Sequence, residues 1–116
     1  MLRKNLGAQG EQLVAQVLEQ RGHRILLRNW RTRWMEIDLV TQINQEVWVV
    51  EVKTRTSEVF GRPEEAVTPG KLIKLRKAGE IVASQPSFSC FRLRLVVVAV
   101  QLEPKPKIKF INVGAS

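Results

Sequence analysis

Residues 35–55 read MEIDLVTQINQEVWVVEVKTR, and this stretch decides the fold. Apolar and polar residues alternate over 35–42 and again over 46–54, which is the pattern of β-strands with one buried face. The INQ segment between the two runs, or its neighbours, supplies a turn, so we expect a hairpin. These apolar strands also contain charged residues that need partners if they are buried. The charged residues of interest are Glu36, Asp38, Glu51 and Lys53.

The segments before this hairpin add a helix and a strand. Residues 5–21 are predicted to be helical because their apolar residues recur at helical spacing and Gly22 follows as a stop. Residues 23–30 are predicted to form a strand. His23 at its start has no second histidine at ligand spacing, so we expect it to cap a turn or lie at the surface.

The segments after the hairpin complete the order of elements. Residues 57–70 contain Gly and Pro breakers and are predicted to form a loop with a short turn at PEEAV. A second helix is predicted over 70–84, and a strand over 91–100 whose continuous apolar run indicates cover on both faces. Residues 107–113 alternate as a final edge strand. The prediction is an α/β fold of order αβββαββ, with helices flanking a mixed sheet in one domain over residues 1–116.

Composition indicates a globular chain with an anionic partner. The 116 residues carry 19 Lys and Arg against 11 Asp and Glu, and nucleic acid is the commonest partner for a net charge of +8. The single cysteine, Cys90, excludes an intramolecular disulfide and a thiolate-rich zinc site, and we expect it to be buried. Every apolar run is shorter than the roughly 18 residues of a membrane span, and the N-terminus lacks an apolar signal segment. We therefore expect a cytoplasmic protein with no membrane partner.

The charged strand residues suggest a metal site. Residues two apart in a strand share a face, so Glu51 lies beside Lys53, and Glu36 beside Asp38. Two carboxylates on adjacent strands repel unless a hard cation lies between them, and Asp38 and Glu51 are the oxygen ligands that Mg²⁺ takes. Lys53 would then orient a metal-bound water or stabilise charge on a phosphate. The alternative is a salt bridge from Lys53 to Glu51 or Asp38, and spacing alone leaves both open.

A further acid, Glu11, lies on the predicted first helix. Val14, Ala15 and Leu18 follow it at offsets of three, four and seven, so Glu11 lies on the apolar stripe. A carboxylate there faces the core and would be satisfied by a metal site or its water. It is also a first-turn acid that the helix dipole favours. The two roles are compatible, and we take Glu11 as the third carboxylate of the site.

Several motifs together resemble a known family. The segments GAQGEQLVAQVLEQRGHRILLRNWR, MEIDLV, VWVVEVKTR and FGRPEEAV, in this order, resemble the YraN-like family of small bacterial proteins. That family is similar in fold to Holliday-junction resolvases and to PD-(D/E)xK nucleases. The resemblance covers roughly residues 7–100, and it implies a restriction-endonuclease-like fold.

The resemblance also implies a site and shows two departures. Asp38, Glu51 and Lys53 match the signature acids and lysine, Glu11 matches the helix glutamate that often joins them, and the implied cofactor is Mg²⁺ or Mn²⁺. Met35 stands where the family usually has Gly, and it is expected to crowd the backbone beside the site. The segment RLRL at 92–95 lacks the acid that relatives often carry there.

Basic and aromatic residues are candidate contacts to nucleic acid. Arg55 has the geometry to clamp a phosphate, and Lys71 opens the second helix, where backbone N–H groups favour anions. Trp30 and Trp34 lie among arginines and could stack on bases, although at least one is expected to pack against a helix. The predicted nucleic-acid-binding residues are Arg28, Arg31, Arg33, Arg55, Lys71, Lys74 and Lys77.

Three functional hypotheses follow, the third being an interaction protein whose apolar edge strand at 107–113 pairs between subunits. The first is a metal-dependent endonuclease acting on branched or single-stranded DNA, with RNA left open. The second is a non-catalytic DNA-binding module that retains the fold, which the two departures motivate. A homodimer would suit a resolvase because it supplies one active site per strand, and the edge strand at 107–113 could pair between subunits.

Overall fold

The computed structural model describes residues 6–57 and 62–115, and its order of helices and strands is αβββαββ, as predicted. Two short 3₁₀ helices, η3 and η4, flank the second α-helix in the chain. The elements are α1 (Leu6–Gln20), β1 (Arg24–Arg31), β2 (Glu36–Ile43), β3 (Glu46–Arg55), η3 (Pro63–Ala66), α2 (Pro69–Ala83), η4 (Pro86–Phe88), β4 (Arg92–Gln101) and β5 (Lys107–Ala115).

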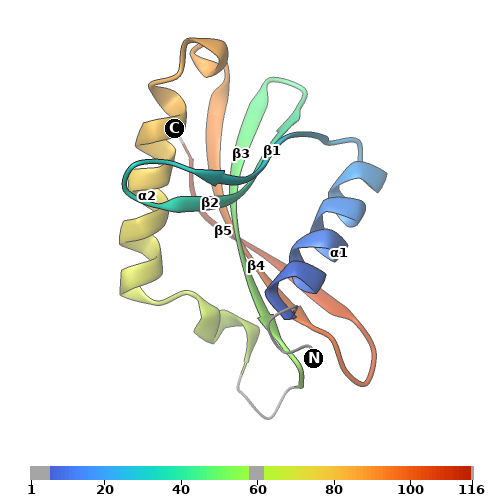
Figure 1. The fold of residues 1–116 in the computed structure, drawn as a ribbon. Helices are drawn as coiled ribbons and strands as arrows, with labels where there is room; N and C mark the ends of the chain where they lie inside the picture. Colours follow the sequence, from blue (N-terminus) through green and yellow to red (C-terminus); the bar gives the residue numbers. More distant parts are fainter. Residues whose placement is uncertain (1–5, 58–61, 116) are drawn as a thin grey trace.

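Five strands form one sheet in the order β1-β2-β3-β4-β5. Neighbouring strands are antiparallel except β3 and β4, which are parallel because the chain crosses over through α2 between them. Figure 1 shows α1 on one side of the sheet and α2 on the other. The prediction of a mixed sheet flanked by helices is confirmed, and the architecture is consistent with a restriction-endonuclease-like fold. In the part of the chain that the structure describes, no helix is long and apolar enough to cross a membrane.

The α1 face of the sheet is a core of small and branched apolar residues. Val14, Ala15 and Leu18 of α1 are buried against strand residues that include Val50. The helix approaches β3 closely at Gly10, where a Cβ atom would collide with the side chain of Thr54. This close approach fixes the height of α1 over the sheet and therefore the position of the next residue along, Glu11. The buried strand residues of this cluster are Leu39, Val50, Val96, Val98 and Val100.

The α2 face has its own core. Leu75, Ala78 and Val82 of α2 are buried against β2, β3 and β4. Thr68 caps the helix, because its Oγ1 accepts a hydrogen bond of 3.2 Å from the N–H of Lys71, and Pro69 occupies the first turn. The cap fixes where α2 begins, and so it places the lysines of its first two turns over β3.

Two residues lie in environments that differ from those predicted. His23 is buried rather than at the surface, because its Nδ1 lies 3.0 Å from the Thr41 hydroxyl and its ring meets Trp48 edge-on at 4.5 Å. Thr41 and Trp48 are cross-strand partners, so the imidazole packs on the hairpin. Burial, and then the charge of Arg21, lower the pKa of His23 below 6.5. Cys90 is exposed rather than buried, because it lies in the turn between η4 and β4.

The element boundaries differ only in detail from the predicted ones. The PEEAV turn is the 3₁₀ helix η3, and β5 ends at Ala115 rather than at residue 113. Residue 5 of the predicted first helix and residues 58–61 of the predicted loop lie outside the described residues. The edge position of β5 is confirmed.

Candidate metal and nucleic-acid site

Asp38 ends the pairing between β2 and β3. The register of the two strands runs from Ile43 opposite Glu46 to Leu39 opposite Val50. Beyond that point Asp38 Oδ2 accepts a hydrogen bond of 2.8 Å from the backbone N–H of Val52. The carboxylate thus accepts the hydrogen bond that a backbone carbonyl of a neighbouring strand would otherwise accept. This bond fixes the position of Asp38 at the end of the ladder.

Glu51 is the most buried acid of the candidate site, at 6% exposure. It follows Val47 and Val49 on the α2 face of β3. Its Oε2 lies 2.6 Å from Lys71 Nζ, and its Oε1 lies 3.3 Å from Lys74 Nζ. Burying this carboxylate is therefore compensated by two ammonium groups from the start of α2. Both lysines were predicted to bind phosphate, and the structure places them on the acid.

The carboxyl groups of Glu11 and Asp38 interact with each other. Burial and the charge of Asp38 raise the pKa of Glu11 from 4.5 to about 7, together with a hydrogen bond between the two side chains. Weaker repulsion from Glu36 and Glu51 acts in the same direction. The pKa of Asp38 is also raised, by burial and by Glu51, against the opposing bond from Val52. The structure therefore brings three of the predicted site residues into one electrostatic group.

The chemistry of these donors suits a hard divalent cation. Carboxylate oxygens are the ligands of Mg²⁺ and Mn²⁺, and a cation among Glu11, Asp38 and Glu51 would relieve the repulsion between these carboxylates. In the described part of the chain, however, no three Asp, Glu, His or Cys side chains are arranged to hold an ion. Glu51 is instead held by Lys71 and Lys74. Metal binding at these acids thus requires that at least one ammonium group leave Glu51.

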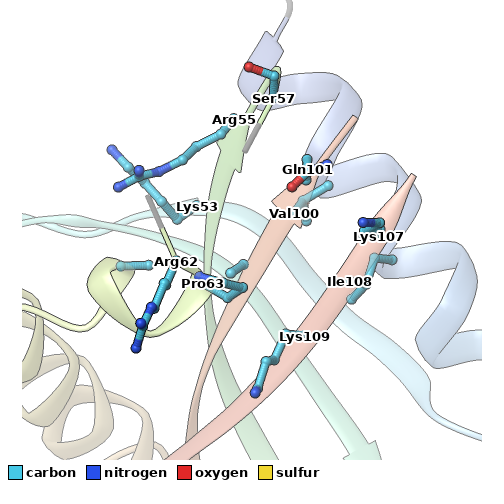
Figure 2. Close-up of a pocket in the computed structure, with 12 residues that line it drawn as sticks. Lys53, Arg55, Ser57, Arg62, Pro63, Val100, Gln101, Lys107, Ile108 and Lys109 are labelled. Atoms are coloured by element: carbon cyan, nitrogen blue, oxygen red, sulfur yellow. The ribbon is translucent and has the colours of Figure 1, made fainter. Parts of the chain in front are cut away.

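Lys53 is exposed and lies two residues beyond Glu51 on the same face of β3. Within the described residues it has no ion pair, so the predicted alternative of a salt bridge to Glu51 or Asp38 is not the arrangement seen. Lys53 and Arg55 instead line a cavity of about 240 Å³ between the sheet and η3 (Figure 2). Glu36 is an exposed acid at the start of β2, where it pairs with Arg31 at 3.8 Å.

Three more of the predicted contacts to nucleic acid, the arginines at 28, 31 and 33, lie at exposed positions of β1 and the β1–β2 turn. Arg28 donates a hydrogen bond of 2.9 Å to Gln12 of α1, and Arg33 lies over the ring of Trp34. Trp34 is 74% exposed, whereas Trp30 packs against the α2-side core. Trp30 is therefore the tryptophan that packs in the core, and Trp34 is the one whose ring is exposed. Lys77 is exposed on α2.

The two departures from the family pattern have structural counterparts. Met35 packs against the α2-side core, and the Thr32 hydroxyl holds its backbone by two hydrogen bonds. Arg94, in the segment without an acid, forms hydrogen bonds of 2.8 and 3.2 Å with Glu46. Bonds from Arg94 and Trp48 lower the pKa of Glu46 to about 2.

Sequence analysis missed this pair and the cations that complete the cavity. Glu46 and Arg94 lie 48 positions apart, and only the parallel register of β3 and β4 brings them together. The cavity cations Lys107 and Lys109 stand two apart in an alternating strand, which was a usable signal that they share a face. No pattern in the sequence around Arg62 predicted its position at the cavity.

Comparison with known proteins identifies the family. Residues 10–100 match the model of the family described as "Uncharacterised protein family UPF0102". A UPF0102 protein of Syntrophomonas wolfei is 48% identical over 88 residues, covering 75% of this chain and 76% of the relative. A UPF0102 protein of Mycolicibacterium vanbaalenii is 40% identical over 112 residues, covering 95% and 93%. One of Alkaliphilus oremlandii is 41% identical over 114 residues, covering 96% and 97%. The chain therefore belongs to the UPF0102 family, which is the YraN family that its motifs resemble.

Proposed function

We propose that the protein is a divalent-metal-dependent endonuclease that acts on branched or single-stranded DNA. The observation that carries this proposal is the group of Glu11, Asp38 and Glu51, in which burial and then the charges of the neighbouring acids raise the pKa of Glu11 to about 7. Burying acids is costly, and acids with perturbed pKa values cluster at functional sites. Their neighbours Lys53, Lys71 and Lys74 supply the positive charge that a phosphate substrate needs.

In this proposal Asp38 and Glu51 hold Mg²⁺ or Mn²⁺. When bound there, such an ion would supply Lewis acidity and a water of lowered pKa. Glu11 can take up a proton near neutral pH, so it is suited to act as the base toward the attacking water. Lys53 is exposed beside the acids and stabilises the negative charge that develops on the phosphate.

The lysines of α2 have a double role in this proposal. Without a cation they neutralise Glu51, and when a cation replaces them their ammonium groups become available for the phosphates of the substrate. Trp34 is exposed beside Arg33, and this pair supports the single-stranded or branched substrate because unpaired bases offer a face for stacking.

A second candidate function is a DNA-binding module without catalysis. The specific observation in its favour is that Lys71 and Lys74 already neutralise Glu51, so the acid has a structural partner without a metal. This function predicts binding that weakens with salt, needs no divalent ion and survives Asp38→Asn.

Cleavage assays separate the two functions. Labelled linear, flapped and four-way DNA, with matched RNA, would be incubated with Mg²⁺ or Mn²⁺ and the wild-type protein or a variant. The endonuclease proposal predicts that Asp38→Asn abolishes cleavage and that Lys53→Met slows it by about 100- to 1,000-fold. Glu80→Gln, which removes an exposed acid of α2, serves as the control and should cleave normally. Binding by all of these proteins with no cleavage by any would favour the module.

A further inference from the structure

Two rows of residues cross the sheet beside the candidate site. Lys53 of β3 is paired with Ala99 of β4, which is paired with Lys109 of β5. Arg55, Gln101 and Lys107 form the next row on the same face. In both rows the outer strands carry cations and the central strand carries a smaller neutral residue. The sheet therefore has a shallow depression on its α2 face, with positive charge on both sides.

The 3₁₀ helix η3 converts this depression into a cavity. Arg62 and Pro63 lie at its start, and Ala66 at its end is buried against the α2-side core, which holds the helix over the strands. Figure 2 shows the lining side chains coming from β3, β4, β5 and η3 around the space between them. The cavity measures about 240 Å³. The apolar side chains on this face of the cavity are those of Pro63, Ala66 and Ala99.

The charge of the cavity is one-sided. None of its described lining residues is Asp or Glu, and five of them are cations: Lys53, Arg55, Arg62, Lys107 and Lys109. Lys109 is paired at 2.8 Å with Glu64, and this pair is half exposed. Within residues 6–57 and 62–115, Lys53, Arg55 and Arg62 have no ion pair. Like charges gathered around a concave surface repel one another, and an anion bound among them relieves that repulsion.

We infer that this cavity binds the phosphomonoester group of a nucleotide. A phosphomonoester carries a charge of about −1.5 to −2 at pH 7 and three acceptor oxygens, whereas an internal phosphodiester carries a single charge. The guanidinium groups of Arg55 and Arg62 suit such an anion because they can donate two parallel hydrogen bonds. The apolar surfaces of Pro63 and Ala99 offer contact to the sugar or base.

The source of that nucleotide is a separate question. Glu51, Lys53 and Arg55 follow one another on one face of β3, so the cavity begins about 7 Å along the strand from the acids. A strand end held in the cavity would thus place a nearby phosphodiester at Asp38 and Glu51. The inference that the bound phosphate belongs to the end of a nucleic-acid strand rests on the proposed nuclease function. The inference that the cavity binds a nucleotide phosphate does not rest on it.

Binding in EDTA tests the inference without cleavage. Fluorescence anisotropy would compare oligonucleotides that carry a 5′-phosphate, a 3′-phosphate or only hydroxyl ends, with dAMP and inorganic phosphate as competitors. We expect one phosphorylated end to bind roughly tenfold more tightly than the hydroxyl end. Arg62→Gln and Ala99→Leu should each reduce that ratio to about one, the first by removing charge and the second by filling space. Arg24→Gln removes an exposed arginine at the far end of β1 and should leave the ratio unchanged.

The outcomes separate the cavity from the nuclease function. Equal binding of phosphorylated and hydroxyl ends, with no competition by dAMP, would overturn the inference, as would an equal loss of preference in Arg24→Gln. If dAMP competes as well as the phosphorylated oligonucleotide, the cavity binds a nucleotide phosphate and the source is the free nucleotide. An end preference in a protein that cuts no DNA with Mg²⁺ or Mn²⁺ supports the cavity and removes the nuclease function. Cleavage without an end preference supports the nuclease function and overturns the inference about the cavity.

Discussion

Glu11→Gln should stabilise the protein at alkaline pH and leave it almost unchanged at acidic pH. In the folded protein the pKa of Glu11 is raised from 4.5 to about 7 by burial and by the charge of Asp38. Between these two values the folded state therefore holds a proton that the unfolded state has lost. Stability falls as pH rises through this window and is constant above it. Glutamine keeps the shape and the hydrogen bond without the charge.

The magnitude follows from the same pKa. A difference between 4.5 and about 7 corresponds to about 3.4 kcal/mol at 1.36 kcal/mol per pH unit. The carboxyl group of Glu11 is only partly buried, so solvent screening reduces this value. We expect Glu11→Gln to raise the free energy of unfolding by about 1–2 kcal/mol at pH 8.5 relative to its effect at pH 4.

Urea denaturation in EDTA at pH 4, 6 and 8.5 measures this difference. Glu19→Gln provides a matched control, because Glu19 is an exposed glutamate on the same helix. A parallel pH dependence in wild type and Glu11→Gln would refute the argument that Glu11 holds the proton. Repeating the titration with Mg²⁺ should lower the stability gain of Glu11→Gln, because a bound cation favours the ionised glutamate.

Three further predictions concern packing and charge. Gly10→Ala should destabilise the protein by about 1–3 kcal/mol in thermal melts, because its Cβ collides with β3, whereas Gly7→Ala has open space and should be neutral or stabilising. Protein stability should fall as pH drops below 6.5 through His23, whose lowered pKa means that the unfolded state binds the proton first; His23→Gln should remove that component in urea titrations. Lys71→Met should destabilise by about 1–3 kcal/mol, and Mg²⁺ should restore more stability than in wild type because Glu51 has lost an ammonium partner.

The order of elements was predictable from the sequence because each element carries its own local pattern. The alternation around Asp38 and Glu51 indicated the β2–β3 hairpin, and helical spacing and a glycine stop indicated α1. Local patterns also placed Glu11 on the inward side of α1. Of the two residues that were placed wrongly, Cys90 is exposed because of its local turn, whereas the environment of His23 depends on distant neighbours. His23 is buried because Thr41 and Trp48 meet across two strands, and nothing adjacent to His23 in the sequence records that pairing.

In the candidate site, too, features set by local sequence patterns were predicted, and those set by distant neighbours were not. The two acids on β2 and β3 were predicted to lie together, and the pKa of Asp38 is raised by burial and then by the charge of Glu51. The partners of Glu51 were not predicted, because they depend on how α2 crosses β3 after the chain has passed through η3. Sequence spacing indicated Lys53 as the partner of Glu51. Two residues that are two positions apart in a strand lie side by side on one face, whereas the lysines of α2 lie over Glu51.

The ion pairs of Glu51 link the stability of the site to its proposed chemistry. A buried carboxylate with two ammonium partners is neutralised in the absence of metal, so the protein can fold before it binds a cation. A cation that enters must compete with Lys71 and Lys74, and its apparent affinity is lowered by the free energy of those pairs. A phosphate substrate changes this competition, because it offers the displaced ammonium groups a new anion. Metal and nucleic acid should therefore bind cooperatively, each increasing the affinity for the other by the same factor.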